Sequence, residues 1–251
     1  MKIGILIPCT SRGYNWSDYK ETFLYHCTFK TFLLTYDKEH EYTFYIGVDK
    51  GDPIYDNEVI KKKFARFLSV MKNVDMEFIY MDGIPKGHLT IMWNRLFEKS
   101  HKDGCDYFFQ CGDDIEFVTS GWVNDCINAL LNTKNVGLAG PINNNIRILT
   151  QSFVSRKHMD LFGYYFPPEI INWCCDDWIN EVYKGVKCYY PLRNHSCINA
   201  GGPPRYIINN DVTINEDNLT ENTNKMREGC AVIVQRDLER IKDKLLLAFL
   251  E

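Results

Sequence analysis

The sequence predicts an α/β domain whose central, mostly parallel sheet is flanked by helices. From residue 3 to residue 111, short apolar runs typical of buried strands alternate with longer stretches whose apolar residues recur at helical spacing. This alternation is typical of doubly wound sheets. Polar residues follow each apolar run, and the carboxyl ends of strands are where such sheets bind their ligands.

The individual elements follow in order from this periodicity. The first half predicts four strands separated by three helices: strands at 3–8, 42–49, 76–82 and 105–111, and helices at 17–36, 56–72 and 89–104. Gly104 ends the third helix, because glycine is common just past a helix end. The second half is less regular, with helices expected at 121–132, 173–185 and 231–251, strands at 135–141, 148–154 and 188–192, and polar loops at 193–206 and 209–229.

Composition narrows the classes of function. Of the 251 residues, 45% are hydrophobic and 25% are charged, as in ordinary globular proteins. The net charge of -4 argues against non-specific nucleic-acid binding, which needs a basic surface. No stretch approaches the roughly 18 apolar residues of a membrane span. We therefore expect neither a nucleic-acid partner nor a membrane span.

The N-terminus and the cysteines bear on the compartment. The apolar run after Lys2 is too short for a signal-peptide core and is better explained as a strand. The ten cysteines include no C-x-x-C pair, so we expect buried thiols in a reducing compartment. This predicts a cytoplasmic protein. The frequent Asn, Ile, Lys and Tyr residues are typical of a low-GC genome, and for a viral chain the compartment is the host cytoplasm.

Adjacent carboxylates follow the fourth predicted strand, in the segment FFQCGDDIEF. Asp113 and Asp114 repel each other unless a cation or hydrogen-bond donors stabilise them. A solvated turn and a metal site both explain the pair. The other strand ends of the first half also carry polar residues, and this convergence favours a ligand site: Thr10-Ser11-Arg12, Asp49 and Lys86-Gly87-His88.

Four stretches, in order over about residues 1–200, resemble the GT-A-fold, nucleotide-sugar-dependent glycosyltransferases, and most closely the broad family-2-like group. IGILIPCTSR looks like the opening nucleotide-contacting segment, and KGHLTIMWNRLFEKS looks like the segment that opens the helix before the metal strand. FFQCGDDIEF looks like the DxD strand, and WCCDDWINEVY looks like the start of the helix that holds the catalytic base.

The resemblance implies transfer of a sugar from a UDP- or GDP-sugar to a hydroxyl of a glycan, protein or small-molecule acceptor, with inversion. Mn²⁺ or Mg²⁺ would offset the charge of the leaving diphosphate. Asp114 and His195 are the expected metal ligands, and Asp176-Asp177 is the expected catalytic pair. The residues expected to bind the nucleotide sugar are Pro8, Thr10, Ser11, Arg12, Asp49, Lys86, Gly87, His88, Asn94, Asp113 and Arg205.

The chain departs from the family pattern at the metal motif. The usual D-x-D reads Gly112-Asp113-Asp114, so the first aspartate is missing. Either Asp114 is the main ligand and Asp113 contacts the ribose, or Asp114-Ile115-Glu116 acts as a D-x-E variant. We favour the first, because Glu116 leads into an apolar continuation.

Within the second acidic pair, we expect Asp177 to be the base and Asp176 to cap the helix. Plain structural roles remain open for several residues: both acids as first-turn helix residues, His195 as a core histidine, Asp49 as a turn residue and Arg12 as surface charge.

The expected organisation is one catalytic domain over 1–208, with a nucleotide-sugar-binding half at 1–117 and an acceptor half at 118–208. Residues 209–251 are expected to form a polar loop and an amphipathic helix packed on this domain. A sugar nucleotidyltransferase is disfavoured because CTSRGYNW lacks a glycine-rich basic loop. A carbohydrate-binding or scaffold protein on a degenerate transferase fold remains open. The sequence does not decide whether the chain forms a homo-oligomer.

Overall fold

An eight-stranded mixed sheet forms the centre of the molecule. The computed structural model describes residues 1–85, 87–201 and 216–250, and within the last range it describes side chains only for 228–245. The strands follow one another across the sheet in the order β3-β2-β1-β4-β7-β6-β8-β5. Their bounds are β1 Lys2–Cys9, β2 Glu41–Val48, β3 Val74–Tyr80, β4 Tyr107–Gln110, β5 Ile115–Phe117, β6 Leu138–Ile142, β7 Ser152–Ser155 and β8 Tyr189–Asn199.

The first four strands in this order, β3, β2, β1 and β4, are parallel to one another. β7 then pairs antiparallel with β4 and with β6, while β6 and β8 are parallel and β5 closes the sheet antiparallel to β8. The predicted class, an α/β fold with a curled and mostly parallel sheet flanked by helices, is confirmed.

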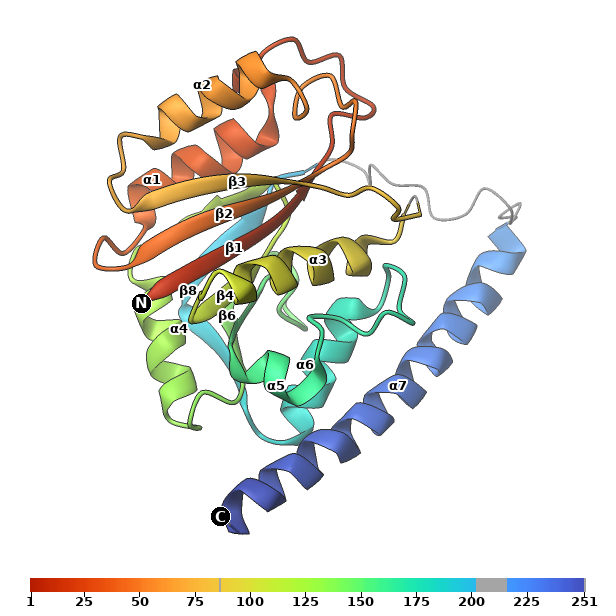
Figure 1. Ribbon diagram of the computed structural model, residues 1–251. Helices are drawn as coiled ribbons and strands as arrows, with labels where there is room; N and C mark the ends of the chain where they lie inside the picture. Colours follow the sequence, from red (N-terminus) through yellow and green to blue (C-terminus); the bar gives the residue numbers. More distant parts are fainter. Residues whose placement is uncertain (86, 202–215, 251) are drawn as a thin grey trace.

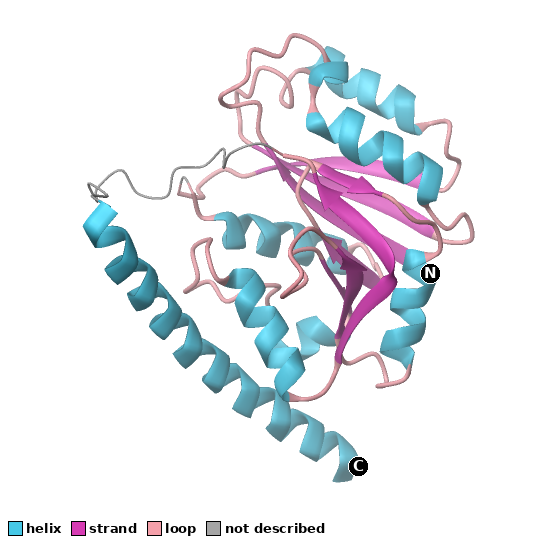
Figure 2. Cartoon of the chain, turned by 180° about the vertical axis from the view of Figure 1, so that it is seen from behind, coloured by secondary structure: helices cyan, strands magenta, loops and turns pink. Residues whose placement is uncertain are grey.

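Helices cover both faces of the sheet (Figures 1 and 2). The 3-10 turn η1, the π-helical turn η2, α1, α2 and α4 lie on one face, and α3, α5 and α6 lie on the other. The long helix α7 runs along α5 and α6. The bounds are η1 Tyr19–Glu21, η2 Leu24–Phe29, α1 Lys30–Thr35, α2 Glu58–Leu68, α3 Leu89–Lys102, α4 Trp122–Leu131, α5 Lys157–Phe162, α6 Cys175–Gly185 and α7 Glu216–Leu250.

Strand β1 shows how the sequence divides the core in two. Ile3, Ile5 and Ile7 point to the face covered by α1 and α2, whereas Leu6 points to the face covered by α3. This alternation is the two-residue period of a strand. Gly4 also faces α3, where a Cβ atom would lie 3.1 Å from the Ser100 side chain, so the residue lets helix and strand approach closely.

Three predicted elements differ from the observed ones. The single helix expected at 17–36 is a 3-10 turn, a π-helical turn and a short α-helix. The loop expected at 193–206 is strand through Asn199, because His195 and Cys197 are buried within β8. The polar loop expected at 209–229 is helical from Glu216 onward, and its earlier part lies outside the described residues. The many asparagines of this segment favoured a loop, although the segment also contains the helix formers Glu, Lys, Met and Arg.

Nine of the ten cysteines are buried, as expected, and Cys174 is half-buried; no disulfide joins any of them, and all ten lie within the described residues. None of the helices in the described part of the chain combines the length and apolarity needed to cross a membrane. The division of the chain at residue 208 stays a prediction.

Candidate functional site

The carboxyl edge of the parallel strands brings together several of the predicted site residues. Cys9 at the end of β1 pairs with Val48 at the end of β2, and Gln110 at the end of β4 pairs with Leu6 of β1. The segments that follow these strands carry Thr10 and Ser11, Asp49, and the Asp113-Asp114 pair, and therefore leave the sheet at one edge. The expected convergence of these segments is present.

A buried carboxylate fixes the loop after β1. Asp52, which is 8% exposed, accepts hydrogen bonds from the Ser11 backbone N–H and Ser11 hydroxyl, both at 2.8 Å. It also accepts the backbone N–H groups of Ile54 (3.0 Å) and Tyr55 (2.8 Å). Asp52 was not among the predicted site residues; the signal available in the sequence was an acidic residue in the turn KGDP just after Asp49. Ser11 is thereby held in the turn beyond the strand end.

Asp113 is fully buried at this edge. The Tyr55 hydroxyl donates to Asp113 Oδ2 at 3.4 Å. The Thr28 hydroxyl donates to the backbone oxygens of Asp113 (2.7 Å) and Ile115 (3.2 Å). Thr28 lies in the π-helical turn η2, and such turns often occur beside functional sites. The π-helical turn thus fixes the backbone that carries the acidic pair.

Asp114 is partly exposed and lies beside the last described residue after β8. Its backbone oxygen accepts the Ala200 N–H at 2.9 Å. A Cβ atom on Gly201 would lie 1.7 Å from Asp114 Oδ2, and one on Gly112 would lie 2.5 Å from Asp114 Oδ1. The carboxylate therefore fits only because Gly112 and Gly201, on its two sides, have no side chains. Burial, followed by Glu116, Asp114 and Asp113, raises the pKa of Cys27 to about 12, so three carboxylates surround this thiol.

His195 is not brought to Asp114. Its ring nitrogens contact Thr119 Oγ1 (3.1 Å) and Asp125 Oδ2 (2.8 Å), at the start of α4. It precedes Ala200 by five residues, on the order of 16 Å along an extended strand. The geometry therefore does not support His195 as a ligand beside Asp114, and matches the open alternative of a histidine buried in the fold.

The second acidic pair opens helix α6, but Asp176 does not have the expected role of helix cap. The N-cap residue is Cys174, in a left-handed conformation with φ 72°, and no side chain caps this helix. Asp176 is thus not the cap. Burial, and secondly the charge of Asp177, raises the pKa of Asp176 to about 7. Trp173, which precedes this helix, is 59% exposed.

Electrostatic contacts link the two acidic pairs. Burial raises the pKa of the Cys111 thiol well above its usual value, and Asp114 and Asp113 add to the effect. Tyr165, whose hydroxyl donates to the Ser152 backbone oxygen at 2.8 Å, has its pKa raised by burial and, among other groups, by Cys111 and Asp176. Cys111 thus interacts electrostatically with the strand-end pair, and Tyr165 interacts electrostatically with both Cys111 and Asp176.

Asn94 and Thr90 hold the segment before α6 against helix α3. Asn94 accepts the backbone N–H groups of Tyr165 and Phe166, both at 2.9 Å, and donates to the Phe166 oxygen at 2.8 Å. The Thr90 hydroxyl donates to the Ile170 oxygen at 2.5 Å. Since these backbone groups occupy its amide, Asn94 positions the 165–166 segment in this structure.

The remaining expected nucleotide contacts are placed as follows. Gly87 is buried and His88 half-buried at the start of α3, and His88 Nδ1 has no hydrogen-bond partner among the described residues. Pro8 and Thr10 are buried, and Arg12 is exposed beyond Ser11. Lys86 and Arg205 lie outside the described residues.

The donor set at this edge limits what a cation site could be. In the described part of the chain, no three His, Cys, Asp or Glu side chains are grouped to hold a metal ion. Asp114 offers one partly exposed carboxylate. This single carboxylate could hold Mg²⁺ or Mn²⁺ only if the ion takes its other ligands from phosphates and water, as Mg²⁺ commonly does.

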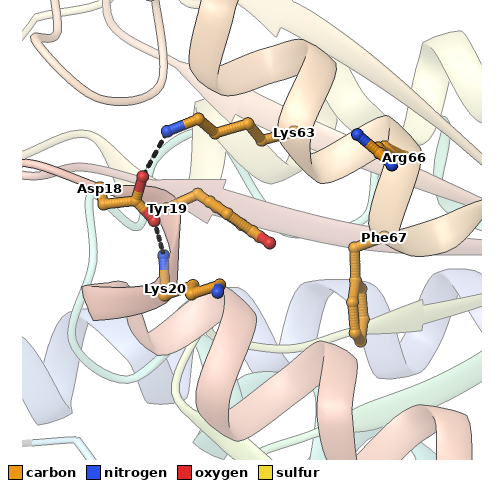
Figure 3. A pocket seen from close by; sticks show the side chains of 6 residues that line it. All are labelled: Asp18, Tyr19, Lys20, Lys63, Arg66 and Phe67. Atoms are coloured by element: carbon orange, nitrogen blue, oxygen red, sulfur yellow. Dashed lines mark hydrogen bonds and ion pairs between the residues drawn. The ribbon is translucent and has the colours of Figure 1, made fainter.

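A hollow of about 440 Å³ lies elsewhere, between η1 and α2 (Figure 3). Its lining is basic and aromatic, and Lys63 pairs with Asp18 across it. None of the expected site residues lines it. The lining residues are Asp18, Tyr19, Lys20, Lys63, Arg66 and Phe67.

Comparisons with known proteins establish the fold. No family model and no curated protein sequence matches the chain. A crystal structure of S. aureus TarS aligns over 82% of this chain and 38% of the TarS chain, with a TM-score of 0.50 and 10% sequence identity. A structure of S. aureus TarS 1-349 in complex with UDP-GlcNAc aligns over 82% of this chain and 57% of that one, with a TM-score of 0.47 and 11% identity. The fold is of the GT-A transferase type, and the chain spans less than two thirds of each of these structures.

Proposed function

We propose that the chain is a glycosyltransferase that moves a sugar from a UDP- or GDP-sugar to a hydroxyl acceptor, with inversion. One observation carries this proposal. A GT-A-type sheet carries an acidic pair after the end of β4, and helix α6, which packs on the same sheet, begins with the carboxyl group of Asp176, whose pKa burial raises to about 7. A general base works best when its pKa lies near the operating pH.

Each part of this edge has a role in the proposal. The turn fixed by Ser11 and Asp52, together with Asp49, holds the nucleoside. Asp114 anchors Mn²⁺ or Mg²⁺, which when bound offsets the charge that builds up on the departing diphosphate. Asp176, rather than the expected Asp177, accepts the proton of the acceptor hydroxyl, because its carboxyl group is the one set in an environment that stabilises the protonated form.

The test of the proposal is a panel of sugar nucleotides scored for hydrolysis and transfer with and without Mn²⁺. We expect one UDP- or GDP-sugar to be turned over with metal. Asp176→Asn should keep donor binding and lose about 10²–10⁴ in turnover, and Asp177→Asn should keep most of it. A folded protein that binds a glycan but no nucleotide sugar, with or without metal, would instead be a carbohydrate-binding protein on a transferase fold.

A further inference from the structure

Helix α7 supports helix α6 along its whole length, from the opposite side to the sheet. Near the start of α6, the Cys230 thiol donates to the Cys174 backbone oxygen at 3.5 Å. In the middle, Trp178 Nε1 donates to Asp237 Oδ2 at 3.1 Å. At the end, Gly185 lies so close to α7 that a Cβ atom would come within 2.5 Å of Leu238. The first two of these contacts flank Asp176.

Asp237 is the most unusual residue of this interface, because it is a carboxylate with 1% exposure. A buried charge needs a counter-charge and donors. Arg236 supplies the charge, with Nε 3.0 Å from Oδ1 and Nη2 3.0 Å from Oδ2. Trp178 and the Tyr164 hydroxyl, at 3.0 Å, supply the donors to Oδ2.

The two donors belong to the two segments that surround Asp176. Trp178 is fully buried, lies two residues after Asp176 on α6 and packs against the rings of Phe162 and Phe166. Tyr164 directly precedes Tyr165, which interacts electrostatically with Asp176. One oxygen of Asp237 therefore joins α6 to the segment that covers it.

We propose that Asp237 is a positioning residue that holds Asp176 in its partly buried place at the carboxyl edge of the sheet. The proposal rests on the proposed function only in naming Asp176 as the base. If the Asp237 contacts are lost, α6 can move away from the 164–166 segment and Asp176 becomes more solvated. The pKa of Asp176 should then fall toward its ordinary value.

The titration of Asp176 in the full-length protein tests this proposal directly. Three titratable groups interact with Asp176 in the described part of the chain: Asp177 and Cys175 on α6 and Tyr165 beyond α5. All three stay unchanged in the variants. With ¹³C-labelled aspartate carboxyl groups, NMR should show Asp176 titrating about one pKa unit lower in Asp237→Ala than in the parent.

Two further variants separate positioning from general destabilisation. Asp237→Asn keeps an acceptor oxygen and should leave the titration of Asp176 near that of the parent. Trp178→Phe removes the N–H donor and reduces the size of the ring, keeps an aromatic side chain in the cluster and should lower the pKa of Asp176. Glu239→Gln, an exposed residue of α7 bonded to Gln235, is the matched control and should change nothing.

The outcomes distinguish this proposal from the proposed function. An unchanged Asp176 titration in folded Trp178→Phe and Asp237→Ala proteins would overturn it, whatever the protein catalyses. If Asp237→Ala does not fold, Trp178→Phe decides. If no sugar nucleotide is turned over, the titration still tests positioning. If one is, Asp237→Ala should lower kcat about tenfold with the donor KM unchanged, since misplacement of a base acts on the chemical step.

Discussion

Replacing Asp176 by asparagine should make the protein more stable at neutral and alkaline pH while removing the proposed general base. Burial raises the pKa of Asp176 to about 7 in the folded chain, from 3.8 for an ordinary aspartate. Between these values the unfolded chain gives up the proton and the folded chain keeps it. Ionisation then favours the unfolded chain, so the free energy of unfolding falls as pH rises from about 4 to about 7 and is constant above.

The size of the effect follows from the two pKa values. Each pKa unit corresponds to about 1.4 kcal/mol, so a difference of about three units gives an upper limit of about 4 kcal/mol. Asp176 is partly exposed, and solvent screening should reduce this to about half. We therefore expect Asp176→Asn to be about 2 kcal/mol more stable than the parent at pH 8 and nearly equal to it at pH 4.

Urea unfolding followed by tryptophan fluorescence at pH 4.5, 6 and 8 measures this difference. Glu181→Gln, an exposed acid on the same helix paired with Lys184 at 2.9 Å, is the control and should show little change at any pH. A variant that is less stable than the parent at pH 8, or a difference that does not depend on pH, would refute the assignment of a raised pKa to this carboxyl group.

Three further predictions concern the rest of the edge. Gly201→Ala should displace the Asp114 carboxylate and so weaken metal-dependent UDP or GDP binding, measured by calorimetry. Asp114→Ala should have the same effect. If both variants bind the nucleotide and metal as tightly as the parent, Asp114 is not a metal ligand. Ser11→Ala should lower the free energy of unfolding by about 1–3 kcal/mol, because Asp52 loses a buried donor, and a neutral result in urea unfolding would contradict that account. Cys174→Gly should raise the melting temperature, because glycine relieves the left-handed backbone, and a lower one would show that the side chain matters more.

The first half of the fold could be predicted because its strands and helices are each defined by local periodicity. β1 alternates between the two cores as its sequence indicates, and the polar residues after β1, β2 and β4 reach one edge because parallel strands end together. The second half could not be predicted in the same way. β8 continues to Asn199 because its first residues pair with β6 and its last residues pair with β5, which satisfies backbone groups at both ends of the strand.

The roles within the site depended on tertiary contacts that no local pattern encodes. The sequence indicated the Asp176-Asp177 pair and predicted that Asp176 caps the helix; the chain instead begins α6 from a left-handed Cys174. Likewise Asn94 was found by its position in a motif, yet its amide is used by the backbone of Tyr165 and Phe166.

The two acidic pairs should therefore respond differently to perturbation outside the site. Asp113 and Asp114 follow a strand at the centre of the sheet, and the backbone around them is fixed by Thr28 and Ala200. Asp176 lies on helix α6, and the side of α6 away from the sheet packs against α7. This contact depends on the buried Asp237 carboxylate, which must keep its ion pair with Arg236. Loosening α7 should leave donor binding intact and impair proton acceptance, because only the second pair depends on that helix for its place.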